Sequence, residues 1–375
     1  MNILCIFVFV NQNSTTIKVC QVLHGIVGGG SEQVVLNYCS RMSDIHFDLL
    51  YQYEPNPQIL ERFNETGLNC IQIPDKVHHP FKHMWAIFRI FRNGHYDVVH
   101  SHLDWFLNAY VMFLALVAGV PKRIAHHHQA YHPTNPLLKL LCAMLRVPNK
   151  MFATHWLACG KAAAENGWGW AAVAKGKVTI LPNAIDPERF KFDAIARKRI
   201  REQYGIAEDD FVVGHVGRFF PEKNHRFIIE LFAELLKKNP KAKLLLVGNG
   251  PLQDDVKKFV HEKSLDDSVI FAGLQKDTVP FYCAFDVLLL PSVREAFPMT
   301  LVEAQYCGLP CVVSEAVPDE AKISKNFVKI DLEHQSKWVD CLLNVKLVNR
   351  ADLTIDTSAF DIRDKYTLLE NLYKN

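Results

Sequence analysis

Two glutamates near the C-terminal third of the chain have the type and the spacing to bind hydroxyl groups. Glu295 and Glu303 have seven residues between them. The apolar run Val287–Leu290 before them is typical of a buried parallel strand, and the segment 299–307 has the pattern of a helix with Pro298 at its start. The pair is therefore expected where a strand ends and a helix begins, a place whose free N–H groups bind anions. Carboxylates beside a bound phosphate would accept hydrogen bonds from sugar hydroxyls.

Two basic residues, Arg218 and Lys223, follow another strand-like run, Val212–Val216. A diphosphate that departs from a sugar gains negative charge, so fixed cations there would stabilise the transition state more than the ground state. Arginine can bind phosphate oxygens with two parallel hydrogen bonds, whereas lysine acts as a compact point charge. By position alone, Arg218 and Lys223 could equally be ordinary surface cations in contact with solvent. The two glutamates could be there because acidic residues favour the first turns of helices.

The run from Pro291 to Ala304 resembles the E-x7-E signature of retaining glycosyltransferases of family 4, which have the GT-B fold. Other segments resemble further motifs of that family and occur in the family's order: Leu181–Asp186, Val216–Asn224, Leu246–Pro251 and Phe271–Gly273. The N-terminal half resembles the family more loosely, through Gly28–Glu32 and Arg123–His128. Taken together, the motifs make the chain similar to bacterial glycosyltransferases of capsular and exopolysaccharide type.

The resemblance implies a role at a nucleotide-sugar donor for each of these residues. Arg218 and Lys223 would bind the diphosphate, Glu303 the ribose hydroxyls, and Glu295 the hydroxyls of the transferred sugar. His128 would bind the donor sugar or polarise the leaving group, and it joins Glu295, Lys223 and Arg218 as a catalytic candidate. Further donor contacts are expected at Gly29, Gly30, Gly248, Gly250 and Leu274, and at the backbone N–H groups of Phe297, Met299 and Thr300.

The sequence does not decide the roles of two loops in this expected site. Gly28–Gly30 lies between a predicted strand and a predicted helix, where glycines allow close backbone approach to a ligand, although a tight structural turn needs the same residues. The pattern is not G-x-G-x-x-G, and Asp48 does not end the second strand, so a nicotinamide cofactor is not expected. Ala296 stands where the family often has glycine, and a positive φ there would cost about 1 kcal/mol.

The histidines and aspartates of the chain do not favour a metal site. His126, His127 and His128 are consecutive, so on a strand the middle one points away from the other two and the three cannot reach one ion. No two aspartates stand two apart, so the D-x-D triplet of the other major glycosyltransferase fold is missing. We therefore expect no metal, and no cofactor beyond the donor as co-substrate. His100 and His102 are expected to line the cleft or to be structural.

Strand-like runs alternate with helical patterns along the chain, which predicts parallel sheets covered by helices on both faces. The predicted strands are Val19–Leu23, His46–Leu50, Val98–His100, Arg123–His126, Val212–Val216, Lys243–Val247, Val269–Phe271, Val287–Leu290 and Cys311–Ser314. The predicted fold class is α/β of the GT-B type, with two doubly wound Rossmann-like domains that face each other across a cleft. We expect an acceptor-side domain at 1–186 and a nucleotide-sugar domain at 187–356. The resemblance implies that a C-terminal helix, within 357–375, packs back on the first domain.

The composition of the 375 residues limits the classes of function. A net charge of +2 does not indicate nucleic-acid binding, and a hydrophobic content of 49% provides a core for two domains. Ten scattered cysteines favour a reduced, cytoplasmic interior. The apolar run in residues 1–10 is too short to span a bilayer, and residues 1–16 fit an extra edge strand, a membrane-touching stub or an artefact of start-site choice. Segments 81–92 and 137–150 have the composition of interfacial helices, although the faces of a Rossmann helix give the same pattern.

The sequence thus predicts a retaining, metal-independent glycosyltransferase. It would move a sugar from a nucleotide-diphosphate donor, with a UDP-sugar favoured, to a hydroxyl of a glycan or lipid-linked saccharide at the cytoplasmic membrane face. One alternative is a GT-B enzyme with different chemistry on a nucleotide sugar, such as an epimerase or a phosphorylase. Another is a non-catalytic, saccharide-binding protein on the same fold. The sequence does not determine the base, the sugar, the acceptor, the linkage or the oligomeric state.

Overall fold

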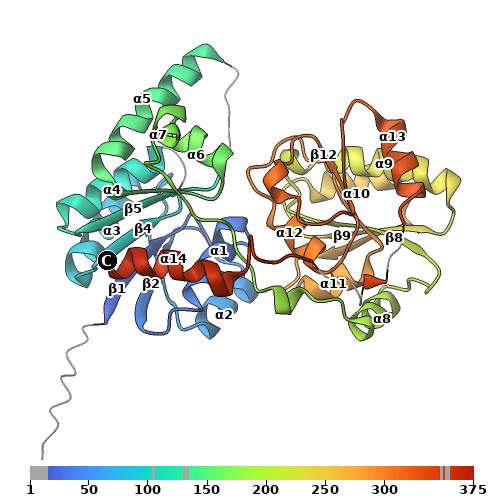
Figure 1. Ribbon diagram of the computed structural model, residues 1–375, viewed down its shortest axis with the longest axis horizontal. Coiled ribbons are helices and arrows are strands. Elements are labelled where there is room, and N and C mark those ends of the chain that lie inside the picture. Colours follow the sequence, from blue (N-terminus) through green and yellow to red (C-terminus); the bar gives the residue numbers. More distant parts are fainter. Residues whose placement is uncertain (1–15, 104–105, 130–134, 347–348, 351–354) are drawn as a thin grey trace, which may run out of the picture.

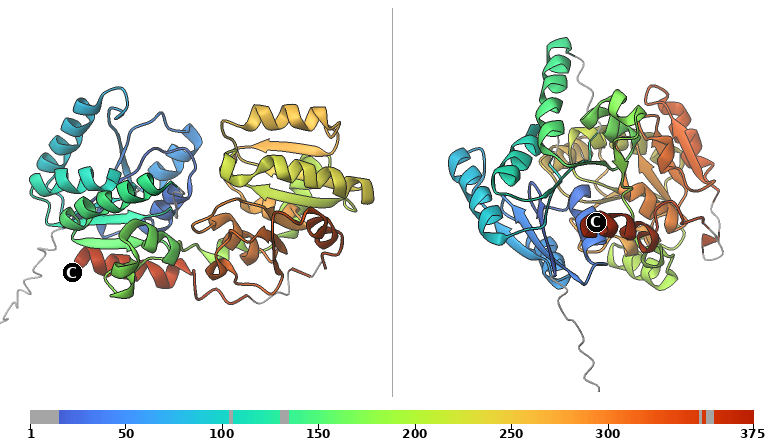
Figure 2. Two further views of the ribbon diagram at one scale, coloured as in Figure 1. Left: turned by 90° about the horizontal axis from the view of Figure 1, so that it is seen from above. Right: turned by 60° about the vertical axis from the view of Figure 1, so that its left-hand side comes forward.

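The computed structural model describes residues 16–103, 106–129, 135–346, 349–350 and 355–375. These residues form two lobes, each a parallel β-sheet with helices on both faces (Figures 1 and 2). The predicted fold class, a pair of doubly wound α/β domains, is confirmed. The alternatives for residues 1–16 concern a segment that, except for its last residue, lies outside the described residues.

The first lobe is built on a seven-stranded sheet in the order β3-β2-β1-β4-β5-β6-β7. Its strands are β1 (Ile17–Val22), β2 (Ile45–Tyr51), β3 (Asn69–Gln72), β4 (Val98–Ser101), β5 (Lys122–His127), β6 (His155–Ala158) and β7 (Thr179–Ile180). Its helices are α1 (Gly30–Cys39), α2 (Pro57–Glu65), α3 (Pro80–Gly94), α4 (Phe106–Val117), α5 (Pro136–Phe152), α6 (Lys161–Trp168) and α7 (Trp170–Ala174). The strand order reverses between β1 and β4, and a doubly wound sheet binds ligands in the crevice beyond such a point.

The second lobe is built on a six-stranded sheet in the order β10-β9-β8-β11-β12-β13. Its strands are β8 (Phe211–Val216), β9 (Ala242–Val247), β10 (Val269–Gly273), β11 (Val287–Leu290), β12 (Cys311–Ser314) and β13 (Phe327–Ile330). Its helices are η1 (Pro187–Phe190), α8 (Ala194–Gln203), η2 (Pro221–Lys223), α9 (His225–Lys238), α10 (Gln253–Glu262), α11 (Val279–Ala284), α12 (Met299–Tyr306), η3 (Asp319–Ala321) and α13 (Gln335–Leu343). The apolar run that predicted a buried strand forms β11, whose side chains are at most 1% exposed. The strands not predicted, β3, β6, β7 and β13, each include partly or fully exposed positions, so none shows the continuous apolar run that marks β11.

The last helix, α14 (Ile362–Lys374), returns from the second lobe and packs against β1 and α1 of the first (Figure 1, in red). Lys122 at the start of β5 donates from Nζ to the backbone oxygens of Leu372 and Tyr373, at 2.7 and 3.0 Å. The Tyr373 hydroxyl is buried and reaches Gln21 on β1. The C-terminus of the chain thus becomes part of the core of the first lobe.

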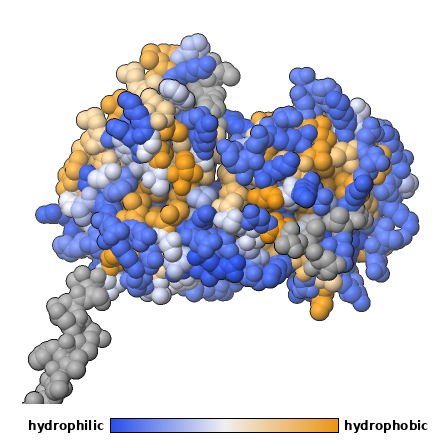
Figure 3. Space-filling model, in the orientation of Figure 1, coloured by the Kyte–Doolittle hydropathy of each residue, from blue (hydrophilic) through white to orange (hydrophobic). Residues whose placement is uncertain are grey.

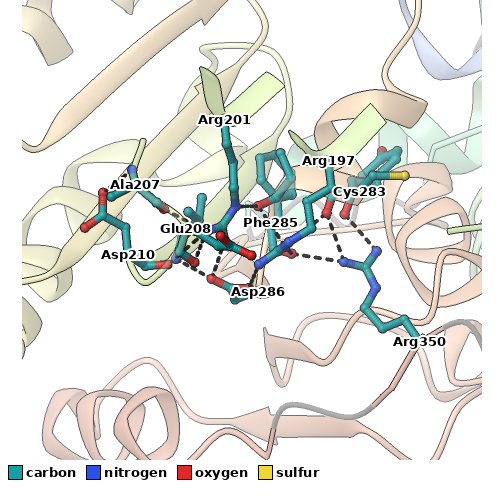
Figure 4. A network of polar contacts seen from close by, with 12 residues as sticks. Arg197, Arg201, Ala207, Glu208, Asp210, Cys283, Phe285, Asp286 and Arg350 are labelled. Atoms are coloured by element: carbon teal, nitrogen blue, oxygen red, sulfur yellow. Dashed lines mark hydrogen bonds and ion pairs between the residues drawn. The ribbon is translucent and has the colours of Figure 1, made fainter. Parts of the chain in front are cut away.

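A buried carboxylate, that of Asp286, holds helix α8 against the central strands of the second sheet (Figure 4). Asp286 directly precedes β11 and accepts hydrogen bonds from Arg197 at 2.7 Å, from Arg201 at 2.8 Å and from the backbone N–H of Val212 at 2.8 Å. Arg350 donates to backbone oxygens at the C-terminal end of α11. Both arginines that bind Asp286 come from α8, so this network ties α8 to the central strands β8 and β11.

Candidate active site

A cavity between the two lobes holds about 920 Å³ of open space, the solvent at its mouth included. The first lobe lines it with the start of α1 and with α2, and the second lobe with the loops after β8, β9 and β10 and the start of α12. It lies beyond the carboxyl ends of the strands, where doubly wound sheets bind their ligands. Its walls include glycines, charged side chains and loop residues from both lobes: Gly28, Gly29, Gly30, Glu32, Arg62, Arg189, Gly217, Arg218, Gly248, Asn249, Leu274, Lys276, Met299, Thr300 and Glu303.

The cavity brings together most of the residues that the sequence pointed to. Those on its walls are Arg218, Glu303, Gly29, Gly30, Gly248, Leu274, Met299 and Thr300. The predicted residues that are not on its walls are Gly250, Phe297, Lys223, Glu295 and His128. Gly250 lines an adjoining groove together with Arg218 and Asn249. The ring of Phe297 packs on Phe360, with centroids 5.0 Å apart, so its side chain belongs to the core.

Glu303 lies on α12 with its carboxylate 2.6 Å from the hydroxyl of Tyr282, which donates to it. Burial raises the pKa of Glu303, while the Tyr282 hydrogen bond and the charges of Arg189 and Arg62 act to lower it. The carboxylate is thus a buried hydrogen-bond acceptor on the cavity wall, held in orientation by a phenol from α11. Such a group suits the recognition of hydroxyls, since each hydroxyl can donate to it.

Four basic side chains from four different segments line the cavity: Arg62, Arg189, Arg218 and Lys276. The guanidinium of Arg218 stacks on the ring of Phe220, 4.3 Å from its centroid, which restrains it at the carboxyl end of β8. Lys276 bridges the two lobes, because its Nζ lies 3.0 Å from carboxylate oxygens of both Glu61 and Glu65 on α2. Arg189 is likewise paired, with Asp277 at 2.8 Å, so the positive charge that the cavity offers an anion comes mainly from Arg62 and Arg218.

Lys223 and Glu295 form an ion pair with each other, with Nζ and Oε1 2.5 Å apart. Ser292 also donates to Glu295 Oε1, at 2.7 Å. Both side chains are largely buried, so opposite charges at this distance attract strongly. The Lys223 stem passes close to Gly217, because a Cβ built on that cavity residue would lie 3.5 Å from Lys223 Cδ. The pair thus adjoins the cavity beside Arg218 rather than lining it.

Two glycines after β9 allow the loops of the second lobe to touch. A Cβ on Gly248 would lie 2.1 Å from the backbone oxygen of Gly217, and one on Gly250 would lie 2.7 Å from the backbone N of Phe219. Both glycines also have positive φ, +136° and +155°. Side chains at these positions would push apart the two loops that form one wall of the cavity.

The glycine loop before α1 is held by an acid from the helix that follows it. Glu32 accepts hydrogen bonds from the backbone N–H groups of Val27 at 2.8 Å and Gly28 at 2.6 Å. Burial raises the pKa of Glu32, and the loop N–H groups and the charge of Arg218 act in the opposite direction. Helix α1 begins at Gly30, so its amino end points into the cavity. In the loop before α12, Ala296 is not among the described residues with positive φ, so alanine carries no strain there.

His128 directly follows β5 and lies against two other histidines. Its Nε2 is 2.9 Å from Nδ1 of His102, and its ring centroid is 4.1 Å from that of His126. His127 points to the opposite face, against Trp168, which confirms the predicted alternation. His128 is half-buried, whereas His102 and His126 are buried beneath it.

The fold brings His100 on β4 and His102 in the loop after it next to His126 and His128. The sequence did not predict this cluster. Nitrogens of His100, His102 and His126 lie within 4.8 Å of one another, close enough for a metal ion to be considered. The rings of His100 and His126 stack with their planes inclined by 14°, whereas the His102 ring is tilted by 31° and 44° from these two. His102 uses both of its nitrogens, on His128 and Gln21, so neither is open to an ion.

The sequences of known proteins decide the family. The model of Glycosyltransferase Family 4 matches residues 28–189, and the model of Glycosyl transferases group 1 matches residues 196–333. The putative glycosyltransferase EpsF of Bacillus subtilis is 30% identical over 379 residues, which cover 96% of this chain and 97% of that protein. This chain belongs to glycosyltransferase family 4.

Other relatives of this glycosyltransferase agree with its fold. The UDP-Gal:alpha-D-GlcNAc-diphosphoundecaprenol alpha-1,3-galactosyltransferase of Escherichia coli is 27% identical over 273 residues, 70% of each chain. Among solved structures, HepE of Anabaena in complex with UDP and glucose has a TM-score of 0.78 at 17% identity, over 96% of this chain and 100% of that one. The lipopolysaccharide glycosyltransferase WaaG has a TM-score of 0.68 at 17% identity, over 95% and 98%. These likenesses establish the GT-B fold.

Several residues on the cavity wall of this glycosyltransferase, and one directly behind it, have no counterpart among the predicted site residues. Tyr282 orients Glu303 from 21 positions earlier in the chain, and Lys276 reaches back to α2. Arg62 and Arg189 enter from a surface helix and from the connection between the lobes. Lys276 follows the predicted strand Val269–Phe271 by five residues, and this position was the one local signal; Tyr282, Arg62 and Arg189 do not follow a predicted strand so closely.

Proposed function

We propose that this glycosyltransferase acts in polysaccharide or glycoconjugate synthesis, with retention of the anomeric configuration. The donor would be a nucleotide-diphosphate sugar, a UDP-sugar by preference, and the acceptor a hydroxyl of a glycan or lipid-linked saccharide. One observation carries the proposal: Arg218 and Glu303 face a single cavity between the lobes. A cation for the diphosphate and a buried acid for hydroxyls are the two groups that such a donor needs.

The charges around the cavity support transfer without a metal ion. Arg62 faces it from the first lobe and Arg218 from the second, and the amino ends of α1 and α12 add partial positive charge. A departing diphosphate gains negative charge, so these fixed groups would stabilise the transition state without rearranging. With no metal needed, EDTA should leave the transfer rate unchanged, and a rate restored only by added Mg²⁺ or Mn²⁺ would contradict this part of the proposal.

The reaction that we propose has the acceptor hydroxyl attack the anomeric carbon from the face that the diphosphate leaves. The bond from that carbon to the phosphate oxygen breaks, the bond to the acceptor oxygen forms, and the departing phosphate takes the acceptor's proton. Lys223 and Arg218 would balance the charge that develops on the diphosphate, while Glu295 and His128 would hold the sugar. Proton NMR of the product tests retention, since an inverted anomer would exclude this course.

The preference for UDP rests on the relatives. HepE was solved with UDP and with UDP-glucose, and the name of the E. coli enzyme gives UDP-Gal as its donor. Calorimetric titration with UDP, GDP and ADP should give the tightest binding for UDP. Binding of GDP or ADP that is tighter than that of UDP would reject the preference while leaving the reaction type intact.

Single substitutions test the site itself. Glu295→Ala and Lys223→Ala should each abolish transfer while the protein stays folded. Lys241→Ala is a matched control, because Lys241 forms an ion pair with Asp209 on the exposed surface of the same lobe. Wild-type rates in purified Glu295→Ala or Lys223→Ala protein would refute the assignment.

Two other classes of function make different predictions in the same assay. An epimerase or phosphorylase on this fold would change the donor without an added saccharide acceptor, and a phosphorylase would need phosphate. A non-catalytic saccharide-binding protein would bind the donor and release no nucleotide. Product analysis with and without acceptor separates these outcomes from transfer.

Exposed apolar side chains on α3 and α5 support a peripheral membrane contact at the cytoplasmic face. Phe81 is 86% exposed, Leu137 74% and Met151 68%, and apolar surface is visible on the lobe that carries these helices (Figure 3). Lys139 and Lys150 on α5 would favour anionic headgroups. No helix in the described part of the chain is both long and apolar enough to cross a bilayer. Flotation with vesicles of anionic lipid at low salt tests the contact, and its absence there would reject it.

A further inference from the structure

A continuous chain of hydrogen bonds runs beneath His128 to the C-terminal helix. His128 Nε2 lies 2.9 Å from Nδ1 of His102, and His102 Nε2 lies 2.9 Å from Oε1 of Gln21. The Gln21 amide nitrogen donates to the Tyr373 hydroxyl at 2.8 Å, and that hydroxyl lies 2.7 Å from Nδ1 of His100. Behind His128, every member of the chain is at most 4% exposed. Its four hydrogen bonds therefore lie in the core of the first lobe, where solvent does not compete for them.

The Gln21 amide gives the chain one polarity. Its oxygen can only accept, so His102 must carry its proton on Nε2, and a neutral His102 then has a lone pair on Nδ1. His128 must therefore donate from Nε2. On the other side of the amide, Tyr373 accepts from the Gln21 nitrogen and can give its single hydrogen only to His100. An amide does not pass protons along, so the chain orients its members rather than conducting protons.

We infer that Gln21 and Tyr373 are positioning residues that hold His128 in one tautomer and one ring orientation for the transfer reaction. The inference rests on the proposed role of His128 at the donor sugar. Tyr373 lies on α14, at the C-terminal end of the sequence, and joins this hydrogen-bond chain through Gln21 on β1. Without its hydroxyl the Gln21 nitrogen keeps only the 3.6 Å contact with Cys39 Sγ, a weak acceptor, so the amide can turn over more readily. Both polarities would be populated, and His128 would divide between two tautomers.

Tyr373→Phe tests the inference, with Tyr38→Phe as a matched control. Tyr38 is equally buried in the same core, and its hydroxyl donates to the backbone oxygen of Pro182 at 2.6 Å, outside the chain. Tyr373→Phe should lower kcat about tenfold with little change in the KM for the donor, the effect expected from one lost positioning hydrogen bond. Tyr38→Phe should leave kcat within about twofold of wild type while losing a similar amount of stability. Equal losses of kcat in the two variants would overturn the inference.

The dependence on His128 is tested by combining the substitutions. In a His128→Ala background, Tyr373→Phe should cause no further loss of kcat, because both act through the same ring. Independent, multiplying losses would overturn the inference. If His128→Ala alone leaves transfer unchanged, the proposed role of His128 fails and the inference fails with it. A loss in His128→Ala without a loss in Tyr373→Phe overturns only the inference.

A spectroscopic measurement needs no activity. In protein labelled with ¹⁵N-histidine, the signals that vanish in His128→Ala identify this ring, and their shifts should report a proton on Nε2. In Tyr373→Phe the same signals should move toward the average of two tautomers. A proton on Nδ1 in the wild type, or signals that Tyr373→Phe does not change, would refute the proposed polarity.

Discussion

Lowering the pH from about 7.5 to about 5.5 is expected to destabilise this glycosyltransferase strongly, because its interior holds histidines that stay neutral. Seven histidines among the described residues are at most 4% exposed, and burial lowers the pKa most strongly in five of them: His100, His102, His126, His215 and His225. Burial lowers the pKa of His215 to about 4, of His100 to about 3 and of His225 to about 2. Burial also lowers the pKa of His102 and His126 well below the ordinary value. In an unfolded chain each histidine would have a pKa of about 6.5.

The sign of the effect follows from these directions. Above about pH 6.5 each histidine is neutral in both states, so protonation does not favour unfolding. Below that pH the unfolded chain binds protons that the native protein does not, and stability is lost as the pH falls toward the native pKa values. Between about pH 7.5 and 5.5 each histidine accounts for a little over 1 kcal/mol, and the five for about 7 kcal/mol. This is comparable to the whole stability of a typical domain, about 5–15 kcal/mol.

Two buried carboxylates oppose this loss. Burial raises the pKa of Glu32 and Glu303, so the native protein takes up protons on them before the unfolded chain does. The stabilisation that protonation of Glu32 and Glu303 gives to the native protein grows as the pH falls through their native pKa values. The five histidines outnumber these two acids, so net destabilisation on acidification is expected.

Urea unfolding followed by tryptophan fluorescence across this pH range measures the effect. Near pH 5.5 the slope of unfolding free energy against pH should correspond to about three to five protons bound on unfolding. His225→Phe is the matched variant, because His225 stacks on Phe219 with centroids 4.0 Å apart and its ring nitrogens have no hydrogen-bond partner among the described residues. A phenyl ring keeps this packing, and the slope should fall by about one proton. A slope below about one proton in the wild type, or an unchanged slope in the variant, would refute the reasoning.

Three further predictions concern single residues. Tyr282→Phe removes the hydroxyl that orients Glu303 and should weaken donor binding by about five- to tenfold, measured by calorimetric titration; unchanged affinity would contradict it. Asp286→Ala leaves Arg201 buried without its carboxylate and should lower the unfolding free energy in urea by about 3–5 kcal/mol, and a loss below about 1 kcal/mol would be inconsistent with this. Gly248→Ala forces a Cβ against the loop after β8 and should both lower Tm and abolish donor binding, whereas a fully active variant would show that the loops can separate.

The sequence by itself determined the class of fold and the residues at the ends of strands. Apolar runs such as 287–290 predict buried strands because the pattern lies within a few neighbouring residues. Arg218 directly follows such a run, whereas Glu303 was found through its spacing from Glu295, in the helix after the next run. Parallel strands bring their carboxyl ends to one edge of a sheet, so residues predicted separately there meet on one cavity.

The tertiary structure decided which side chains touch. Lys223 and Glu295 were both identified in the sequence, but nothing in it indicated that they pair with each other. The partner of Glu303, Tyr282, comes from another helix, and the contact of Gln21 with Tyr373 joins residues 352 positions apart. Such contacts depend on how helices pack across and between the lobes. Hydrophobic periodicity reports only which face of an element is buried and not what it meets there.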